Sequence, residues 1–376
     1  MAGADQIDQG RRDMSAMRWA LDRRALLGLG PGGAAWALVE SIRARRARAA
    51  APPPPVDPRE RRLANLRQLT FGGQNAEAYF DWTGTRLIFQ STRPPFGCDQ
   101  IFTMREDGSD VRLVSTGKGR TTCSFFFPDG RRAIYASTHL GGAGCPPPPD
   151  RSGGYVWPIY PTYEIFSADL QNGALARLTD HDGYDAEGAV SPDGRRIVFT
   201  SLREGDLDLY LMDVDGSKIR RLTAEPGYDG GPFFSWDGRF IVFRASRPEA
   251  QSELTEYRTL LSQSLVRPRR LEVFVMRADG TGLTQVTRSG AASFAPFMHP
   301  NSQQIIFSSN LHDPSGRTFS LYLVNVDGSG LERVTYGETF ASFPMFSRDG
   351  TKLVFCGSRN AAAPRDLNVF LADWAA

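Results

Sequence analysis

The sequence has little of what enzymes commonly use for acid–base, nucleophilic or metal chemistry. It contains only four histidines and four cysteines in 376 residues. No two cysteines form a Cys-x-x-Cys pair, which argues against a structural zinc site. The chain also has no Gly-x-Ser-x-Gly nucleophile turn and no His-Glu-x-x-His zinc motif. These absences favour a non-catalytic protein over an enzyme.

Net charge and long apolar runs are also scarce. The net charge is only +2, and no basic stripe follows the N-terminal region, so nucleic acid is not an expected partner. The apolar stretch at residues 25–39 is too short and too glycine-rich for a comfortable membrane span, and no other segment could cross a bilayer. Hydrophobic residues nevertheless make up 41% of the chain, enough for a packed fold.

The first 55 residues are typical of a leader that is separate from the folded domain. Arg23 and Arg24 precede the apolar stretch, and a basic run with an Ala-x-Ala end and a polyproline segment follows it. This order resembles an export signal, and the paired arginines resemble the twin-arginine pattern. A disordered basic leader with a chance arginine pair is the alternative. We expect residues 1–55 to form a leader and linker, residues 56–376 to fold, and the protein to be periplasmic or exported.

The most informative feature that is present is a repeated turn, usually Asp-Gly, followed by a β-branched and aromatic run. The last residues of these turns are 84, 130, 194, 238, 302 and 350. Successive turns are therefore 46, 64, 44, 64 and 48 residues apart. A base period in the mid-forties is typical of propeller blades. The two longer intervals predict insertions at residues 140–163 and 248–270.

Each repeat predicts four antiparallel strands. In the third repeat a short strand at residues 188–190 precedes the turn, and runs at 196–201, 208–212 and 219–223 follow it. Asp-Gly between alternating runs is a strong hairpin signal, since glycine accepts a positive φ and aspartate tolerates it.

The number of closing strands predicts how the ring is sealed. Six closing strands can be counted, and the first, at residues 66–70, precedes any complete repeat. The last repeat has no fourth strand of its own, so residues 66–70 are expected to complete it. Closure of this kind leaves no open sheet edge. The sequence thus predicts an all-β, six-bladed β-propeller of four-stranded antiparallel blades.

The repeat resembles that of TolB-like propellers. The resemblance is carried by SPDG-x-x-I-V-F-T-S-x-R and the following D-L-Y-L-M-D-x-D-G-S-x-x-R-R-L-T, and it extends over residues 64–374. It implies a periplasmic propeller, although related repeats occur in binding proteins, in non-catalytic domains of peptidases and in oligogalacturonate lyases. Only about ten residues separate the polyproline segment from the first strand, too few for the extra N-terminal domain of TolB itself.

The loops between blades and the ends of the second strands are expected to meet around the channel mouth, where a rigid scaffold can present functional residues. Acidic residues recur in the loops, and arginines or a histidine recur at the strand ends. The predicted binding residues are Glu77, Arg93, His139, Asp185, Glu187, Arg203, Asp229, Arg247, His312 and Arg359. Two interpretations stay open: the arginines tether one blade to the next through carboxylates, or some of these groups bind a polar or peptide ligand.

Both insertions are expected on the same face. The first contains six prolines and several aromatic residues, of which Tyr155, Trp157 and Tyr160 are predicted to contact a ligand or partner. The second predicts a short helix at residues 252–265. Long additional loops on a compact domain are often functional, so the first insertion is expected to cover the mouth, to dock a partner, or to pack over a blade edge.

The few histidines and cysteines support two further expectations. His139 stands where other repeats have arginine, and His312 lies near the equivalent position in another repeat. With carboxylates they could hold a divalent metal ion, as the metal site of oligogalacturonate lyases would imply. If the protein is exported, Cys98, Cys123 and Cys145 are candidates for a disulfide, with its pairing left open. The alternative is that all four cysteines are small, buried or half-buried residues without a disulfide.

The favoured function is a non-catalytic periplasmic binding or interaction module without a cofactor. Its expected partner is an envelope protein, a peptide, or a polar small molecule or saccharide, and a monomeric state is compatible with the sequence. The alternatives are a metal-dependent carbohydrate-active enzyme and an accessory propeller that gates a hydrolase.

Overall fold

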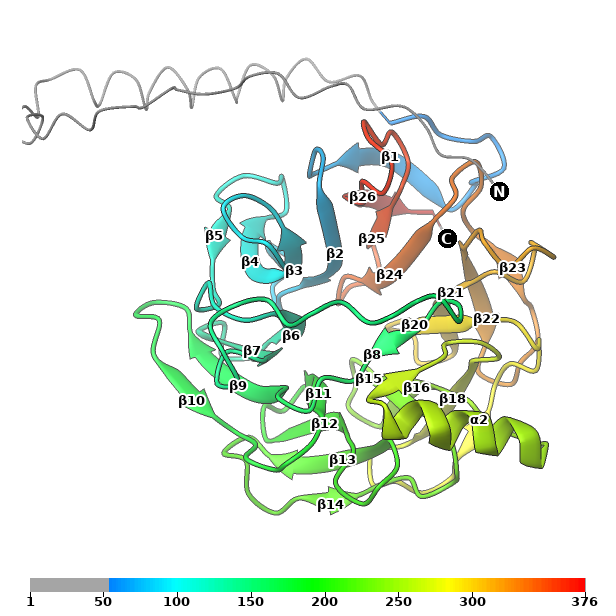
Figure 1. Cartoon of the computed structure of the whole chain (residues 1–376). Coiled ribbons are helices and arrows are strands. Elements are labelled where there is room, and N and C mark those ends of the chain that lie inside the picture. The colour runs from blue at the N-terminus through cyan, green and yellow to red at the C-terminus, as the bar shows by residue number, and fades with distance from the viewer. Residues whose placement is uncertain (1–53, 376) are drawn as a thin grey trace, which may run out of the picture. The chain divides into compact units, whose positions relative to one another are not determined.

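The computed structural model describes residues 54–375, so nearly all of the predicted leader lies outside the described residues. Six four-stranded sheets are arranged as blades around a central axis (Figure 1). All neighbouring strands within a blade run antiparallel. The predicted six-bladed β-propeller is therefore confirmed. In the described part of the chain, no helix is long and apolar enough to cross a membrane.

The innermost strands surround the axis and the other strands follow outward. The six innermost strands are β2 (Gln74–Phe80), β6 (Thr121–Phe126), β11 (Asp185–Val190), β15 (Asp229–Phe234), β20 (Ser293–Met298) and β24 (Ala341–Phe346). The second strands are β3 (Arg86–Thr92), β7 (Arg132–Ser137), β12 (Arg196–Ser201), β16 (Phe240–Ala245), β21 (Gln304–Ser309) and β25 (Lys352–Gly357). The third strands are β4 (Gln100–Arg105), β9 (Glu164–Asp169), β13 (Asp208–Asp213), β18 (Glu272–Arg277), β22 (Ser320–Asn325) and β26 (Asn368–Trp374).

The outermost strands are short in every blade except the last. They are β5 (Arg112–Leu113), β10 (Leu175–Arg177), β14 (Arg220–Arg221), β19 (Thr284–Gln285), β23 (Glu332–Arg333) and β1 (Leu63–Gln68). A repeated hydroxyl explains where they end: a serine or threonine after each outer strand accepts a hydrogen bond from a third-strand N–H at 2.8–3.0 Å. The six hydroxyls belong to Thr70, Ser115, Thr179, Thr223, Thr287 and Thr335. The side chain satisfies a backbone donor that would otherwise lack its ladder partner, so the threonine or serine that ends each closing strand is structural.

An aromatic pair recurs at the same register between the second and third strands of every blade. Phe199 lies opposite Tyr210 in the third blade, for example, with ring centroids 5.9 Å apart. The other five pairs are Phe89–Phe102, Tyr135–Phe166, Phe243–Phe274, Phe307–Tyr322 and Phe355–Phe370. Cross-strand aromatic pairs stabilise a sheet by about 0.2–1 kcal/mol each. The repeated aromatic residues therefore form much of the core between blades.

The ring closes as the sequence predicted. Strand β1 pairs antiparallel with β26 and completes the last blade in the order β1-β26-β25-β24. This strand begins three residues before the expected range of 66–70. The chain thus brings its N-terminal and C-terminal strands together in one sheet, as the blue and red strands in Figure 1 show.

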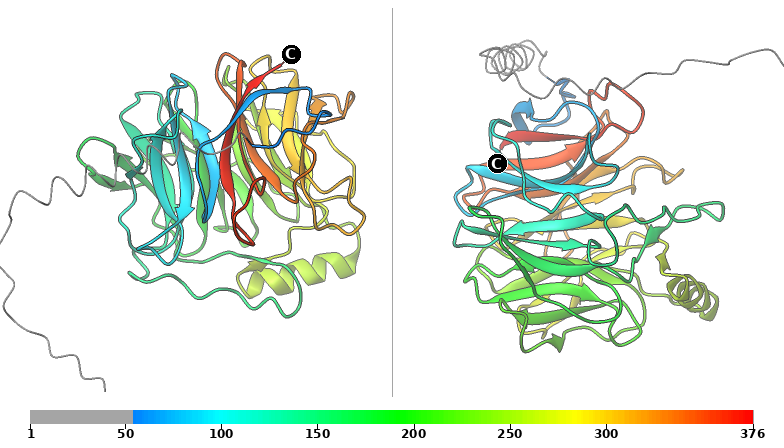
Figure 2. Two further views of the ribbon diagram at one scale, coloured as in Figure 1. Left: turned by 90° about the horizontal axis from the view of Figure 1, so that it is seen from above. Right: turned by 60° about the vertical axis from the view of Figure 1, so that its left-hand side comes forward.

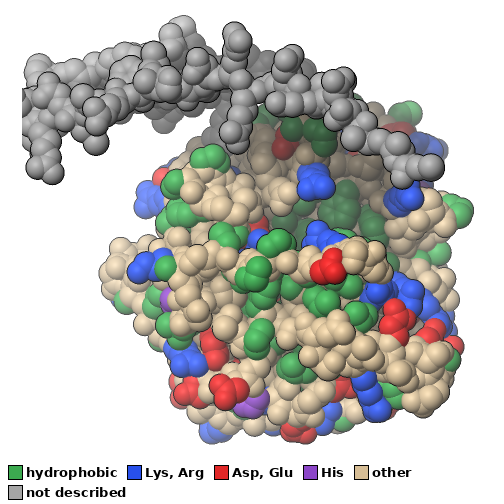
Figure 3. Space-filling model, viewed as in Figure 1, with side chains coloured by type: hydrophobic (Ala, Val, Ile, Leu, Met, Phe, Trp, Pro, Cys, Tyr) green, Lys and Arg blue, Asp and Glu red, His purple; other side chains and the backbone are tan. Residues whose placement is uncertain are grey.

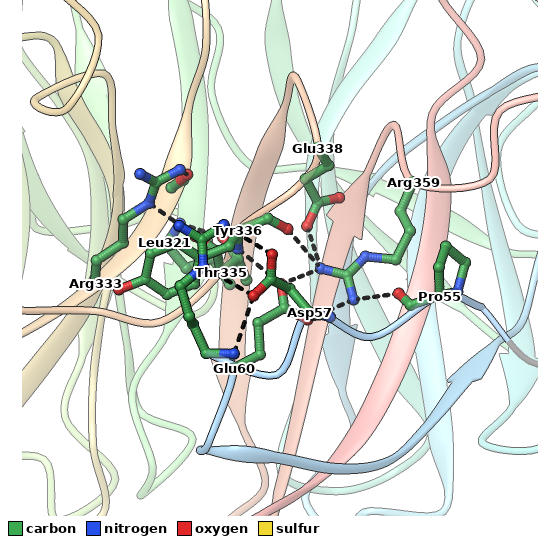
Figure 4. Close-up of polar contacts among 11 residues, drawn as sticks. Pro55, Asp57, Glu60, Leu321, Arg333, Thr335, Tyr336, Glu338 and Arg359 are labelled. Atoms are coloured by element: carbon green, nitrogen blue, oxygen red, sulfur yellow. Dashed lines mark hydrogen bonds and ion pairs between the residues drawn. The ribbon is translucent and has the colours of Figure 1, made fainter.

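A buried ionic clasp holds the N-terminal segment beside this joint (Figure 4). Arg359 donates to both Glu60 and Glu338 and also to the carbonyl oxygen of Pro55 at 3.0 Å. The Glu60 carboxylate accepts a further bond from the backbone N–H of Tyr336 at 2.7 Å. All three charged side chains are at most 4% exposed. The predicted binding residue Arg359 therefore lies in a structural network that joins the two ends of the propeller.

The two insertions meet each other on one face of the propeller. Strand β8 (Trp157–Pro158) from the first insertion pairs antiparallel with β17 (Leu265–Val266) from the second. The predicted helix is present as α2 (Gln251–Ser262), and Figure 2 shows it beside the same face of the ring. A disulfide joins Cys98, in the β3–β4 connection, to Cys145 in the first insertion. The expected disulfide is present, while Cys123 and Cys356 are free.

Candidate binding cavity at the channel mouth

A cavity of about 1250 Å³ lies at the end of the channel that the insertions cover. Figure 3 shows this face, where hydrophobic side chains lie next to basic ones over the centre of the ring. The three insertion residues predicted to contact a ligand, Tyr155, Trp157 and Tyr160, all line the cavity. The other aromatic lining residues are Tyr163, Tyr184, Tyr228, Phe294, Phe319, Phe340 and Phe343. The cavity is thus an aromatic chamber roofed in part by the paired insertions.

A β-bulge in each innermost strand shapes the floor of this cavity. In all six blades the pairing of the first and second strands shifts register near the start of the inner strand. One residue per shift has a positive φ of 50–59°, and these residues are Glu77, Cys123, Glu187, Gly231, Ala295 and Phe343. Five of the six carry a side chain in a conformation that glycine favours. Equivalent bulges place these six positions as a ring around the channel.

These bulges correct the expected position of the acidic residues. The sequence placed Glu77, Asp185, Glu187 and Asp229 in inter-blade loops, whereas all four lie inside inner strands. The strands begin earlier than expected because the bulge interrupts the alternation of apolar and polar residues that marks a strand in the sequence.

The six floor positions divide into a polar half and an apolar half. Glu77, Cys123 and Glu187 are contributed by three consecutive blades, and glycine, alanine and phenylalanine occupy the other three. Each glutamate accepts a hydrogen bond from the bulge N–H of the following blade: Glu77 from Cys123 at 3.1 Å, and Glu187 from Gly231 at 2.6 Å. The carboxylates thereby link neighbouring blades and also face the cavity.

Glu187 belongs to a polar cluster that includes Arg244, Tyr228 and Thr200. Its carboxylate pairs with Arg244 at 2.6 Å and accepts hydrogen bonds from Tyr228 at 3.1 Å and Thr200 at 2.9 Å. Arg244 also lies over the ring of Trp157, 5.1 Å from its centroid, so the cluster connects the cavity wall to the roof. A charge buried at this depth is stable only with such a partner and hydrogen bonds.

Two glycines make room for this cluster. A Cβ atom at Gly231 would lie 2.0 Å from Nη1 of Arg244, and one at Gly230 would lie 2.2 Å from the hydroxyl of Tyr228. No side chain could occupy either position without displacing the cluster. This close approach explains why the fourth blade alone has a glycine at its bulge position, where the other five blades have a residue with a side chain.

Glu77 has a different environment. In the described structure its carboxylate accepts a hydrogen bond from the backbone N–H of Cys123, and no arginine or lysine forms an ion pair with it. Burial raises the pKa of the Glu77 carboxyl to about 7. The hydrogen bond from Cys123 acts in the opposite direction and lowers the pKa, whereas the negative charge of Glu187 raises it further. The floor thus holds two carboxylates and one guanidinium, and Glu77 is the carboxylate without a cation.

The pKa of Glu77 predicts a pH-dependent stability difference. The folded state binds this proton more tightly than the unfolded chain does, so ionisation between pH 4.5 and 7 destabilises the fold. The Glu77→Gln variant should have the same free energy of unfolding as the wild type near pH 4 and a free energy of unfolding about 1–3 kcal/mol higher at pH 8. The expected difference is kept to this range because the carboxylate faces a water-accessible cavity, where solvent screens its charge. Urea unfolding at both pH values measures this. Glu225→Gln, the same change at an exposed site, should alter the free energy of unfolding by less than about 0.5 kcal/mol. A stability difference between Glu77→Gln and the wild type that is equal at both pH values would contradict this prediction.

Most of the remaining predicted site residues lie outside the cavity lining and have an ion-pair or hydrogen-bond partner within their own blade. Arg203 pairs with the buried Asp185 at 2.7 Å, and Arg247 pairs with the buried Asp229 at 2.6 Å. In each pair both residues belong to the same blade. The expected arginine–carboxylate pairs are present, but they join the first and second strands of one blade, whereas the tether interpretation expected them to join neighbouring blades.

The other predicted residues at the strand ends also have internal partners. Arg93 donates to Asn75 at 2.8 Å and lies over the ring of Phe102. His139 contacts the hydroxyl of Ser137 at 2.8 Å. His312 contacts the hydroxyl of Thr318 at 3.1 Å. These contacts fix the second-strand ends and the loops that follow them.

Residues 54–375 bring together no group of three or more histidine, cysteine, aspartate or glutamate side chains that could hold a metal ion. His139 belongs to the second blade and His312 to the fifth. Burial lowers the pKa of both imidazoles.

The sequence reasoning missed several lining residues, of which Arg244 is the most informative. Six equivalent second-strand positions lie opposite the bulges, and they hold Gln90, Ala136, Thr200, Arg244, Ser308 and Cys356. Arg244 is the one charged residue among them, within an otherwise apolar strand. A departure of this kind from the repeat was the available signal. The aromatic residues Phe294, Phe319 and Phe340 carried no such signal, since they resemble ordinary core positions.

Comparisons with known proteins agree with this architecture. A family model described as the TolB β-propeller domain matches residues 161–266. The fold is similar to that of a protein assigned as TolB from Agrobacterium tumefaciens, with a TM-score of 0.54 and 18% identity over 81% of this chain and 91% of that one. TolB from Acinetobacter baumannii gives a TM-score of 0.52 and 16% identity over 81% of this chain and 64% of that one. An oligogalacturonate lyase from Vibrio parahaemolyticus gives 0.48 and 12% identity over 82% and 93%, a level of likeness that carries no functional inference.

The repeats, the closure of the ring and the family match together define the class of protein. It is a six-bladed β-propeller with four-stranded blades, sealed by its N-terminal strand. Residues 161–266 match the family model of the TolB β-propeller domain, and the fold is similar to that of TolB structures. The resemblance noted in the repeats is therefore confirmed.

Proposed function

We propose that this protein is a non-catalytic, exported binding module that takes a ligand or a segment of an envelope partner into the cavity at the channel mouth. The observation that carries the proposal is the chamber of about 1250 Å³ with aromatic walls. Ligand sites in proteins are typically concave, largely apolar, and about 300–1000 Å³ in volume. A chamber at or above the upper end of this range has room for a short peptide segment or an oligosaccharide.

The residues at the rim support a polar or charged ligand. Arg120, Arg267 and Arg269 line the cavity beside the aromatic residues, and Arg317 is exposed there. Arg120 pairs with Asp99 at 2.7 Å, and Arg267 pairs with Glu256 at 2.9 Å. Paired arginines at a rim contribute orientation and specificity more than affinity. Together with the aromatic walls they favour an amphipathic ligand.

The disulfide supports an exported location. Cys98 and Cys145 are joined across 47 residues, and disulfides persist mainly in oxidising compartments such as the periplasm. The proposal requires no metal ion or other cofactor. Elemental analysis of purified protein is expected to find no stoichiometric transition metal.

Binding to defined ligand collections tests the proposed function. The protein, comprising residues 54–376, would be screened against a displayed peptide library and an oligosaccharide array. We expect ligands whose affinity falls at least tenfold in Trp157→Ala, which removes the roof, and in Ala291→Trp, which fills the cavity. Phe71→Ala removes an exposed aromatic side chain that is not part of the cavity lining and should leave binding unchanged. Ligands that bind all three variants equally, or none at all from either collection, would overturn the proposal.

A further inference from the structure

Glu77 is the one acidic group on the cavity floor that the structure leaves without a cation. The neighbouring charged groups are accounted for: Glu187 is held by Arg244 at 2.6 Å, and Asp99 is held by Arg120 at 2.7 Å. Cys123 donates its backbone N–H to Glu77 and carries a neutral thiol, because burial raises the pKa of this thiol. One positive charge placed beside Glu77 would therefore balance the floor.

The groups around Glu77 indicate what kind of cation fits. The opposite half of the bulge ring consists of Gly231, Ala295 and Phe343. These residues offer no side-chain hydroxyl, amide or carboxylate to a ligand. A hydrated metal ion or the hydroxyl-rich ring of an amino sugar would leave polar groups unsatisfied against this apolar half. An ammonium group attached directly to an apolar side chain would place its charge at Glu77 and its apolar part against the other half.

Aromatic rings add to the attraction of a cation. Phe343, Tyr228 and Tyr184 line the same chamber, and aromatic faces attract cations by about 0.5–2 kcal/mol when water is excluded. The backbone of Glu77 has a φ of 52°, a conformation that costs free energy in a residue with a side chain. The surrounding sheet holds this backbone conformation despite that cost, so the carboxyl group is positioned before any ligand arrives.

We propose that the floor of the cavity is a binding site for a protonated primary amine, with Glu77 as its counter-ion, and that the ligand is a peptide whose free N-terminal residue is apolar. This inference rests on the proposed function and specifies the ligand. The peptide inserts with its amino terminus first, and the amine lies between Glu77 and the apolar half of the ring. The following residues extend along the aromatic walls toward the arginines of the rim.

Two matched probes test this proposal by isothermal titration calorimetry at pH 7.0. They are Phe-Ala-amide, which has a free amine, and its N-acetylated form, which has the same apolar groups and no charge. The free amine should bind at least tenfold more tightly. Glu77→Gln should remove that difference and leave binding of the acetylated probe unchanged. The surface variant Glu225→Gln should behave as the wild type. Because the two probes are compared first on the wild-type protein, the result does not depend on how well any variant folds.

The possible outcomes separate this inference from the proposed function. Equal binding of both probes to the wild type would overturn the amine site and leave the cavity as a binding site. Glucosamine that bound more tightly than the peptide, and lost affinity in Glu77→Gln, would overturn the peptide assignment. Failure of both probes, together with library ligands that bind the cavity independently of Glu77, would overturn the amine site alone. Failure of both probes and of the library would overturn the proposed function as well.

Discussion

Replacing Arg359 with methionine should lower the free energy of unfolding by about 3–5 kcal/mol, since breaking a buried ion pair leaves an uncompensated buried charge. Arg359 is the only cation paired with Glu60 and Glu338 in the described structure, and both carboxylates are at most 1% exposed. Burial already raises the pKa of the Glu338 carboxyl to about 7, against the influence of Arg359. Urea unfolding at pH 7.5 measures the loss. The N-terminal segment should also become more susceptible to proteolysis, because Arg359 holds it through Pro55 and Glu60.

Two further variants show whether the effect comes from the clasp. Arg112→Met removes an arginine whose ion pair with Asp110 is exposed, and it should change stability by less than about 0.5 kcal/mol. Adding Glu338→Gln to Arg359→Met should recover part of the loss, since it removes one of the two stranded carboxylates. A loss below about 1 kcal/mol in Arg359→Met would show that the clasp contributes little to closure of the ring.

Loss of the Cys98–Cys145 disulfide should lower the free energy of unfolding by about 2–4 kcal/mol, the usual range for a cross-link that closes a loop of this length. The bond ties the first insertion to the β3–β4 connection of the first blade. The Cys98→Ser/Cys145→Ser variant should therefore unfold at lower urea concentration and should bind cavity ligands more weakly. The second effect is expected because Trp157 and Tyr160 of the same insertion roof the cavity. Unfolding and ligand titration of the same samples would measure both.

A reductant provides the matched control for this prediction. Dithiothreitol should lower the stability of the wild type to that of the double variant and should not affect the double variant further. Cys123→Ser, which removes a free cysteine at the cavity floor, should retain the response to reductant. Equal stability of oxidised and reduced wild type would contradict the prediction.

The sequence by itself determined the blades, their number and the closure of the ring. Asp-Gly turns, the alternation of apolar residues and a period in the mid-forties are local features, and every blade except the last comes from one contiguous stretch of chain. The position of the N-terminal strand also followed, because one closing strand was in excess at the start and one was missing at the end. The closing strands were recognisable as a repeat, although the role of their final hydroxyl in ending the outer strand required the structure.

Only the tertiary structure decided which of the repeated side chains face the cavity. Glu187 and Asp185 are two residues apart, yet one lines the floor and the other is buried against Arg203. The difference arises because the register of the strand pairing shifts between Ala186 and Ala189. Glu187 lies within this bulge, whereas Asp185 lies before it. Arg244 joins Glu187 across two blades, and β8 joins β17 over more than 100 residues of chain. Contacts of this kind depend on how blades pack around the axis, a relation that no local pattern in the sequence encodes.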